Sequence, residues 1–208
     1  MKTAQQLSYT IWSLGALVTI IGLLAWSQRL GGEFTLYTFF PLLGILAFSL
    51  MWTHYISGTL RRISNQKMSA LRTYFQVTSG IVLVLILLHP GLFYLQLFLD
   101  GLGVPPASYM QAYPDIAART AILIGTLSLI VFLSFEFHRK FGSRSWWKYV
   151  DYANIAAMFG IFYHALTLGG DLMQGWFRIV WFLYGILLVG AIVFNHLHDR
   201  KNIANKVS

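Results

Sequence analysis

The chain of 208 residues contains no cysteine and few charged residues. The lack of cysteine excludes disulfide bonds, thiolate metal sites, iron–sulfur clusters and cysteine nucleophiles together. Charged residues make up only 11% of the chain, whereas 57% are hydrophobic and 16% are aromatic. Soluble domains have more charge and less apolar content than this. A glycine-rich dinucleotide motif beside a strand is also missing. These features predict an integral membrane protein without a flavin domain of its own.

Six apolar segments occupy nearly the whole chain, each close to the roughly 20 residues that cross a bilayer. They lie at about residues 8–28, 36–57, 75–98, 116–137, 150–168 and 176–196. The first is too long for a signal peptide, and no small-residue cleavage site follows it. We therefore predict an all-α fold, in which residues 1–208 form a single domain of six transmembrane helices.

The basic residues are concentrated on one side of the predicted membrane domain. They fall in the connections after the second and fourth segments and in the tail: Arg61, Arg62, Lys67, Arg72, Arg139, Lys140, Arg144, Lys148, Arg200, Lys201 and Lys206. By the positive-inside rule this side is cytoplasmic. We therefore expect a multi-pass protein of the cytoplasmic (inner) membrane with both termini in the cytoplasm. Because topology accounts for the net charge of +8, we expect lipid as a partner and no nucleic acid.

Two histidines are predicted to lie at the same depth in different helices. His89 follows Arg72 by 17 residues, and His164 follows Lys148 by 16. At 1.5 Å per residue, both lie roughly 25 Å from the inner surface. Neutral imidazole is a good iron ligand, so we predict that His89 and His164 bind one heme b near the outer face. A structural or proton-relay pair and another metal are the alternatives. Zinc is disfavoured, because no third ligand is evident at this depth.

Small residues precede His164 at helical spacing, namely Ala153, Ala157 and Gly160. A flat macrocycle needs such a clearing, so Ala157 and Gly160 are predicted to contact the cofactor. The alternative is that these small residues let two helices approach closely in lipid.

Two arginines lie just inside the outer ends of the fourth and sixth segments, Arg119 and Arg178. The planar guanidinium group suits carboxylates, so both are candidates to bind the heme propionates. Alternatively, both side chains extend to the interface, with Arg119 near Asp115.

Two further histidines, His54 and His138, lie near the inner ends of the second and fourth segments. They could pair around a second heme. We favour a single heme, because His138 adjoins Arg139 and Lys140 at the water interface.

The stretch from about Arg72 to Leu168 has a distinctive order of features. A helix that opens with Arg72 has His89 near its end, and a basic inner loop follows the next helix. The segment Arg144-Ser145-Trp146-Trp147-Lys148-Tyr149-Val150 then leads into the helix that contains His164. This order resembles the ferric reductase-like transmembrane domain family, and within it the MsrQ-type heme-binding subunits that serve periplasmic methionine sulfoxide reductases.

The resemblance implies an electron-transfer subunit of an oxidoreductase system. A b-type cytochrome of this kind would pass electrons to an extracytoplasmic acceptor from a cytosolic flavoprotein or from quinol, with FMN or quinone as the donor cofactor. Its partner would be a flavin reductase or an extracytoplasmic reductase. Where the wider family has ligands for an inner heme, this chain has Asp151, Gln76 and Phe75. Two other functions stay open: a heme-free scaffold or assembly subunit, and a small proton- or solute-conducting protein with His89, His164 and Asp151 as a relay.

Overall fold

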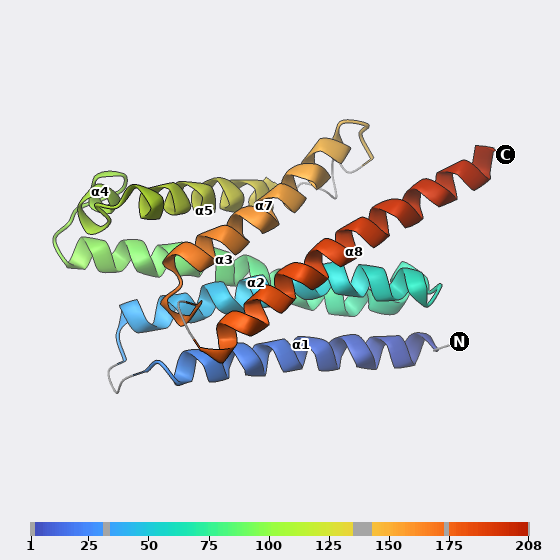
Figure 1. The fold of residues 1–208 in the computed structure, drawn as a ribbon, viewed down its shortest axis with the longest axis horizontal. Helices are drawn as coiled ribbons and strands as arrows, with labels where there is room; N and C mark the ends of the chain where they lie inside the picture. Colours follow the sequence, from blue (N-terminus) through green and yellow to red (C-terminus); the bar gives the residue numbers. More distant parts are fainter. Residues whose placement is uncertain (1–2, 31–33, 135–142, 173–174, 208) are drawn as a thin grey trace.

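The computed structural model describes residues 3–30, 34–134, 143–172 and 175–207, and the described part is helical without strands (Figure 1). The long helices are α1 (Ala4–Ser27), α2 (Leu36–Ile63), α3 (Arg72–Leu99), α5 (Ile116–Ser134), α7 (Trp147–Leu168) and α8 (Trp176–Val207). The short ones are η1 (Met68–Leu71), α4 (Ala107–Ala112) and η3 (Gly170–Leu172). Each of the six predicted segments therefore contains one long helix, which confirms the all-α prediction.

Within the described residues, five helices are long and apolar enough to cross a membrane: Ala4–Ser27, Leu36–Ile63, Met68–Leu99, Ile116–Ser134 and Trp176–Asp199. Helix α7 has 22 residues but is less apolar, because polar side chains such as Asp151, Asn154 and His164 interrupt it. The multi-pass membrane character is therefore supported, while the sixth span stays a prediction.

Capping boxes fix where α1 and α2 begin. At α1, Gln6 N–H donates to Thr3 Oγ1 at 3.2 Å, and Thr3 N–H donates to Gln6 Oε1 at 2.9 Å. Thr35 and Thr38 form the same reciprocal pair at the start of α2. Such pairs satisfy backbone donors that have no partner within the helix. Both helices therefore have defined starting points at the membrane boundary.

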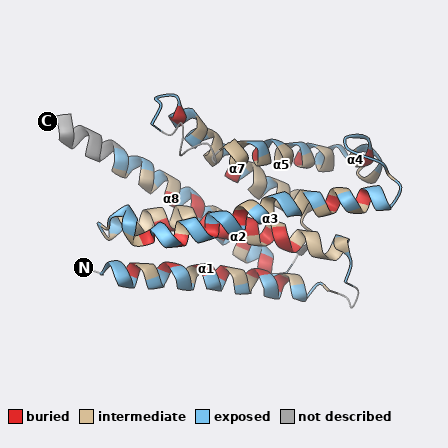
Figure 2. Cartoon of the chain, turned by 180° about the vertical axis from the view of Figure 1, so that it is seen from behind, coloured by how far each residue is buried: buried red, intermediate tan, exposed pale blue. Residues whose placement is uncertain are grey.

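The closest backbone packing divides the bundle into two parts (Figure 1). Helix α2 packs against α1, α3 and α8, and α5 packs against α7. Burial is strongest along α2 (Figure 2). Phe48 of α2 lies 4.3 Å from Trp181 of α8 between ring centroids, and Phe162 of α7 reaches both rings, at 6.2 and 5.9 Å. The α5–α7 pair thus meets the other helices through large side chains, which leaves space between the two parts.

Helix α8 extends beyond the predicted end at residue 196. Arg62 donates to both carboxylate oxygens of Asp199, at 3.2 and 3.1 Å, and Thr59 donates to Asn195 at 3.2 Å. These bonds fasten the last turns of α8 to the end of α2. The start of α1 and the end of α8 consequently lie at the same end of the bundle (Figure 1).

The connection between residues 100 and 115 is rich in proline and glycine, which is typical of an irregular loop, but it contains α4. Tyr109 of α4 stacks on Phe93 of α3 with 5.8 Å between ring centroids and 11° between ring planes. This aromatic contact stabilises the one and a half turns of α4. The proline and glycine content of the connection gives no indication of this helix.

Candidate functional site

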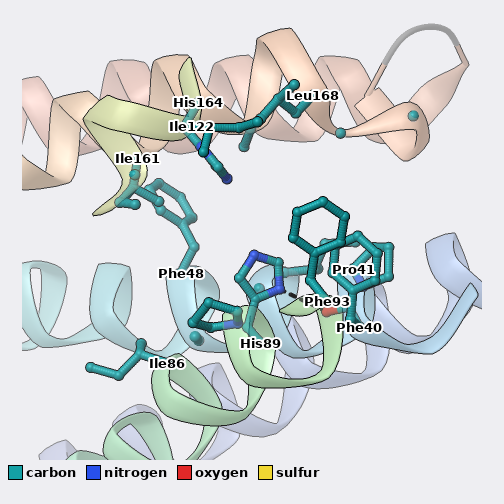
Figure 3. A pocket seen from close by; sticks show the side chains of 18 of the residues that line it. Phe40, Pro41, Phe48, Ile86, His89, Phe93, Ile122, Ile161, His164 and Leu168 are labelled. Atoms are coloured by element: carbon teal, nitrogen blue, oxygen red, sulfur yellow. Dashed lines mark hydrogen bonds between the residues drawn. The ribbon is translucent and has the colours of Figure 1, made fainter. Parts of the chain in front are cut away.

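His89 of α3 and His164 of α7 come together between the two parts of the bundle. Their ring centroids lie 6.4 Å apart, with 79° between the ring planes. Figure 3 shows the two imidazoles pointing toward one another across the space between the helices. The prediction that these residues meet is confirmed, while their role as iron ligands stays a prediction.

A backbone carbonyl on a neighbouring helix sets the protonation of each imidazole. His89 Nδ1–H donates to the oxygen of Phe40 on α2 at 2.8 Å. His164 Nδ1–H donates to the oxygen of Ala121 on α5, also at 2.8 Å. A carbonyl can only accept, so in both neutral rings the proton is on Nδ1 and the lone pair is on Nε2. Metal-bound histidines are oriented by the same kind of outer hydrogen bond.

The separation of the two rings distinguishes a shared metal from a direct hydrogen bond. Two imidazoles that bind one metal through Nε2, with bonds of about 2.0–2.1 Å, have ring centres roughly 6.4 Å apart. A direct hydrogen bond of about 2.9 Å between nitrogens would bring the centres to roughly 5.2 Å. The observed 6.4 Å therefore matches two ligands on a common ion and is too long for direct contact between the nitrogens.

Two glycines make room for the histidine rings. A β-carbon at Gly44 would lie 2.9 Å from His89 Cε1, and one at Gly125 would lie 2.6 Å from His164 Nδ1. Each glycine comes four residues after the carbonyl that accepts from the same ring, Phe40 or Ala121. The α2–α3 and α5–α7 pairs thus hold their histidines by the same arrangement of carbonyl and glycine.

Sequence reasoning missed these two glycines and found no internal repeat. A weak signal does exist in the Leu42-Leu43-Gly44-Ile45-Leu46 and Leu123-Ile124-Gly125-Thr126-Leu127 segments. Each of these segments lies in the helix that precedes a histidine-containing helix. The position of these segments in the sequence does not reveal the contacts, because each glycine packs against a histidine of another helix.

A cavity of about 370 Å³ surrounds the histidine pair, within the size range of small-molecule sites. Its central walls are apolar and include Phe48, Ile86 and Ile161 beside the imidazoles (Figure 3). Toward the connections between α1 and α2 and after α7, the wall includes Arg29 and Gly170. The cavity therefore has an apolar middle and a polar end.

The structure places Ala157 and Gly160 away from this cavity, since neither residue lines it. A β-carbon at Gly160 would lie 2.9 Å from Ile124 and Ser128 of α5. The small residues of α7 therefore permit its close packing on α5, which is the alternative interpretation of this stripe. Gly44 and Gly125 line the cavity instead, and the imidazole rings themselves occupy the space beside these glycines.

The two arginines predicted to bind propionates also lie outside the cavity wall. Arg119 donates to the carbonyl oxygens of Tyr113 at 2.7 Å and Met110 at 2.9 Å, and so holds the connection before α5. Arg178 is exposed, with its guanidinium carbon 5.8 Å from the Phe182 ring centroid. The arginine that does line the cavity is Arg29, just after the end of α1, which was not among the candidates predicted from the sequence.

His54 differs from the central pair because its Nε2 atom, not Nδ1, makes the hydrogen bond. Thr78 Oγ1 donates its hydrogen to Tyr74 O at 2.7 Å and therefore accepts from His54 Nε2–H, also at 2.7 Å. The Nε2 atom of His54 is thus occupied. Its suggested partner for a second heme, His138, lies outside the described residues. Asp151 is exposed in the second turn of α7 and does not line the cavity.

No cluster of three or more histidine, aspartate or glutamate side chains that could bind a metal occurs in the described part of the chain. Two opposed imidazoles suit a metal whose remaining ligands come from a macrocycle, as in heme. No family model matches the chain, and no curated protein or solved structure is significantly similar to it.

Proposed function

We propose that this protein is a membrane b-type cytochrome of the ferric reductase-like type, close to the MsrQ-type subunits, with one heme bound by His89 and His164. It spans the cytoplasmic membrane six times and transfers electrons from a cytosolic flavoprotein or quinol to an extracytoplasmic acceptor. One observation supports this above all: the two imidazoles point toward one another with 6.4 Å between ring centroids, while Nδ1 of each ring is bonded to a backbone carbonyl (Figure 3).

The residues around the pair fit a heme. Gly44 and Gly125 accommodate the imidazole rings, and the carbonyls of Phe40 and Ala121 keep the Nε2 atoms free to bind iron. The wall beside the two imidazoles is mainly apolar, as a porphyrin ring requires. A bound heme would supply the reversible one-electron change of its iron, while the chain fixes the orientation and protonation of both imidazoles.

The position of the site supports transfer toward the outer face. Phe40 and Ala121 lie in the second turns of α2 and α5, and both histidines lie in the second half of their helices. These helix ends are opposite the end where α1 begins and the basic connections occur. With that basic end in the cytoplasm, the histidines lie nearer the outer surface.

The test is the absorption spectrum of the purified protein. The preparation should be red, with a Soret band that shifts on reduction by dithionite. His89→Ala and His164→Ala should each remove the band, whereas His196→Ala, at an exposed position of α8, should keep it. A colourless wild-type protein from cells with ample heme would overturn the proposal and favour the scaffold or relay.

A further inference from the structure

The cavity has one permanent charge among its described lining residues, the guanidinium group of Arg29. The rest of its wall is apolar, aromatic or neutral. The planar guanidinium group of an arginine in such a wall is suited to binding a carboxylate of a ligand. The cavity therefore has an apolar body at the histidines and a guanidinium group at its other end, where an anionic group of a ligand could be bound.

Gly170 determines where the Arg29 side chain lies. A β-carbon at position 170 would be 1.8 and 2.1 Å from the two terminal guanidinium nitrogens. The guanidinium thus occupies the space that any larger residue at 170 would fill. Gly170 begins η3, just after the end of α7, so Arg29 lies over the end of the helix that contains His164.

We propose that Arg29 binds the heme carboxylates and so orients the cofactor with its propionates toward the outer end of the cavity. This inference rests on the proposed function and assigns to Arg29 the role that sequence analysis gave to Arg119 and Arg178. The planar fork of arginine matches a carboxylate in two hydrogen bonds, which an ammonium group cannot reproduce.

The experiment pairs a change in the protein with a change in the ligand. Wild-type protein and Arg29→Gln are loaded with hemin or with hemin dimethyl ester, in which both carboxylates are blocked. Transfer of each to excess apomyoglobin then gives the rate of release. A charge-assisted hydrogen bond corresponds to about tenfold to hundredfold in affinity. Wild-type protein should therefore release the ester about tenfold to hundredfold faster than hemin, and Arg29→Gln should release both at similar rates.

Three further variants distinguish a loss of carboxylate recognition from a general disturbance of the structure. Arg29→Lys should recover only part of the discrimination between hemin and its ester, because its charge remains without the fork. Gly170→Ala should resemble Arg29→Gln, since it moves the guanidinium without removing it. Arg178→Gln, at an exposed position outside the cavity wall, should discriminate as the wild type does.

The outcomes test the role of Arg29 separately from the ability of the protein to bind heme. If Arg29→Gln binds hemin and still discriminates against the ester as strongly as wild type, the role of Arg29 is overturned while heme binding stands. If the wild-type protein takes up neither compound, the proposed function fails, and the role of Arg29 fails with it.

Discussion

Gly125 lies directly against the imidazole ring of His164, so a larger residue at position 125 would overlap the ring. A β-carbon there would lie 2.6 Å from Nδ1 and 2.8 Å from Cε1 of the imidazole. The same Nδ1 donates to Ala121 O, one turn earlier on α5. The ring is therefore fixed from two sides by a single turn of the neighbouring helix, and Gly44 with Phe40 does the same for His89.

Replacing either glycine by alanine should displace the histidine beside it. Overpacking of this kind costs about 1–3 kcal/mol in a closely packed site, so heme binding in Gly44→Ala and Gly125→Ala should weaken by roughly fivefold to a hundredfold. The ratio of heme to protein after purification, with the Soret maximum, measures the effect.

Gly80→Ala and Gly190→Ala are the matched controls, because a β-carbon at either position would have no neighbour within 4 Å. Alanine at these helical positions should keep full heme content and raise stability by up to about 1 kcal/mol. Equal heme content in all four variants would show that the close approach of glycine to histidine does not shape the site.

The near-perpendicular rings, at 79°, predict the electron paramagnetic resonance signal of the ferric protein. Perpendicular imidazole planes interact equally with two iron d orbitals and leave them close in energy, which makes a low-spin signal strongly anisotropic. We expect such a signal in frozen samples of the oxidised protein. A rhombic spectrum, as parallel planes produce, would contradict the observed ring orientation.

His54→Ala should keep the heme spectrum and stoichiometry of the wild type, since Nε2 of His54 already donates to Thr78. Loss of this buried hydrogen bond should cost about 1–3 kcal/mol and lower the melting temperature in detergent. Heme content and thermal unfolding are measured on the same preparation. A loss of half the heme would instead assign His54 to a second site.

The absence of cysteine allows the topology to be tested with single introduced thiols. Ser69→Cys and Ser145→Cys, both at exposed positions in basic connections, should react with a membrane-impermeant maleimide only after permeabilisation. Gln111→Cys, exposed on α4, should react in intact cells.

Ser208→Cys decides whether α7 crosses the membrane. Six spans return the end of the chain to the cytoplasm, so position 208 should be protected in intact cells together with 69 and 145. Labelling of Ser208→Cys from outside would mean five spans.

The sequence predicts the helices well, because length and apolar content alone determine which segments can enter a bilayer. The equal depth of His89 and His164 was also predictable, since depth along a straight helix follows from residue count. Both predictions depend only on distances measured along one helix.

Contacts between helices were harder to predict. The residues around Gly44 and Gly125 in the sequence do not indicate that each glycine contacts a histidine of another helix. Ala157 and Gly160 illustrate the converse, because small residues next to a histidine in sequence face another helix instead. Arg119 lies outside the cavity wall and Arg29 lines it for the same reason, because rotation about the helix axis and loop geometry are set by packing.

The division of the bundle into a part with α1, α2, α3 and α8 and a part with α5 and α7 links assembly to ligand binding. Each part contributes one of the two central imidazoles, so an ion bound to both acts as a cross-link between an early and a late portion of the polypeptide. Because a ligand that binds only the native state stabilises it by mass action, loss of the cofactor and separation of these portions are coupled equilibria.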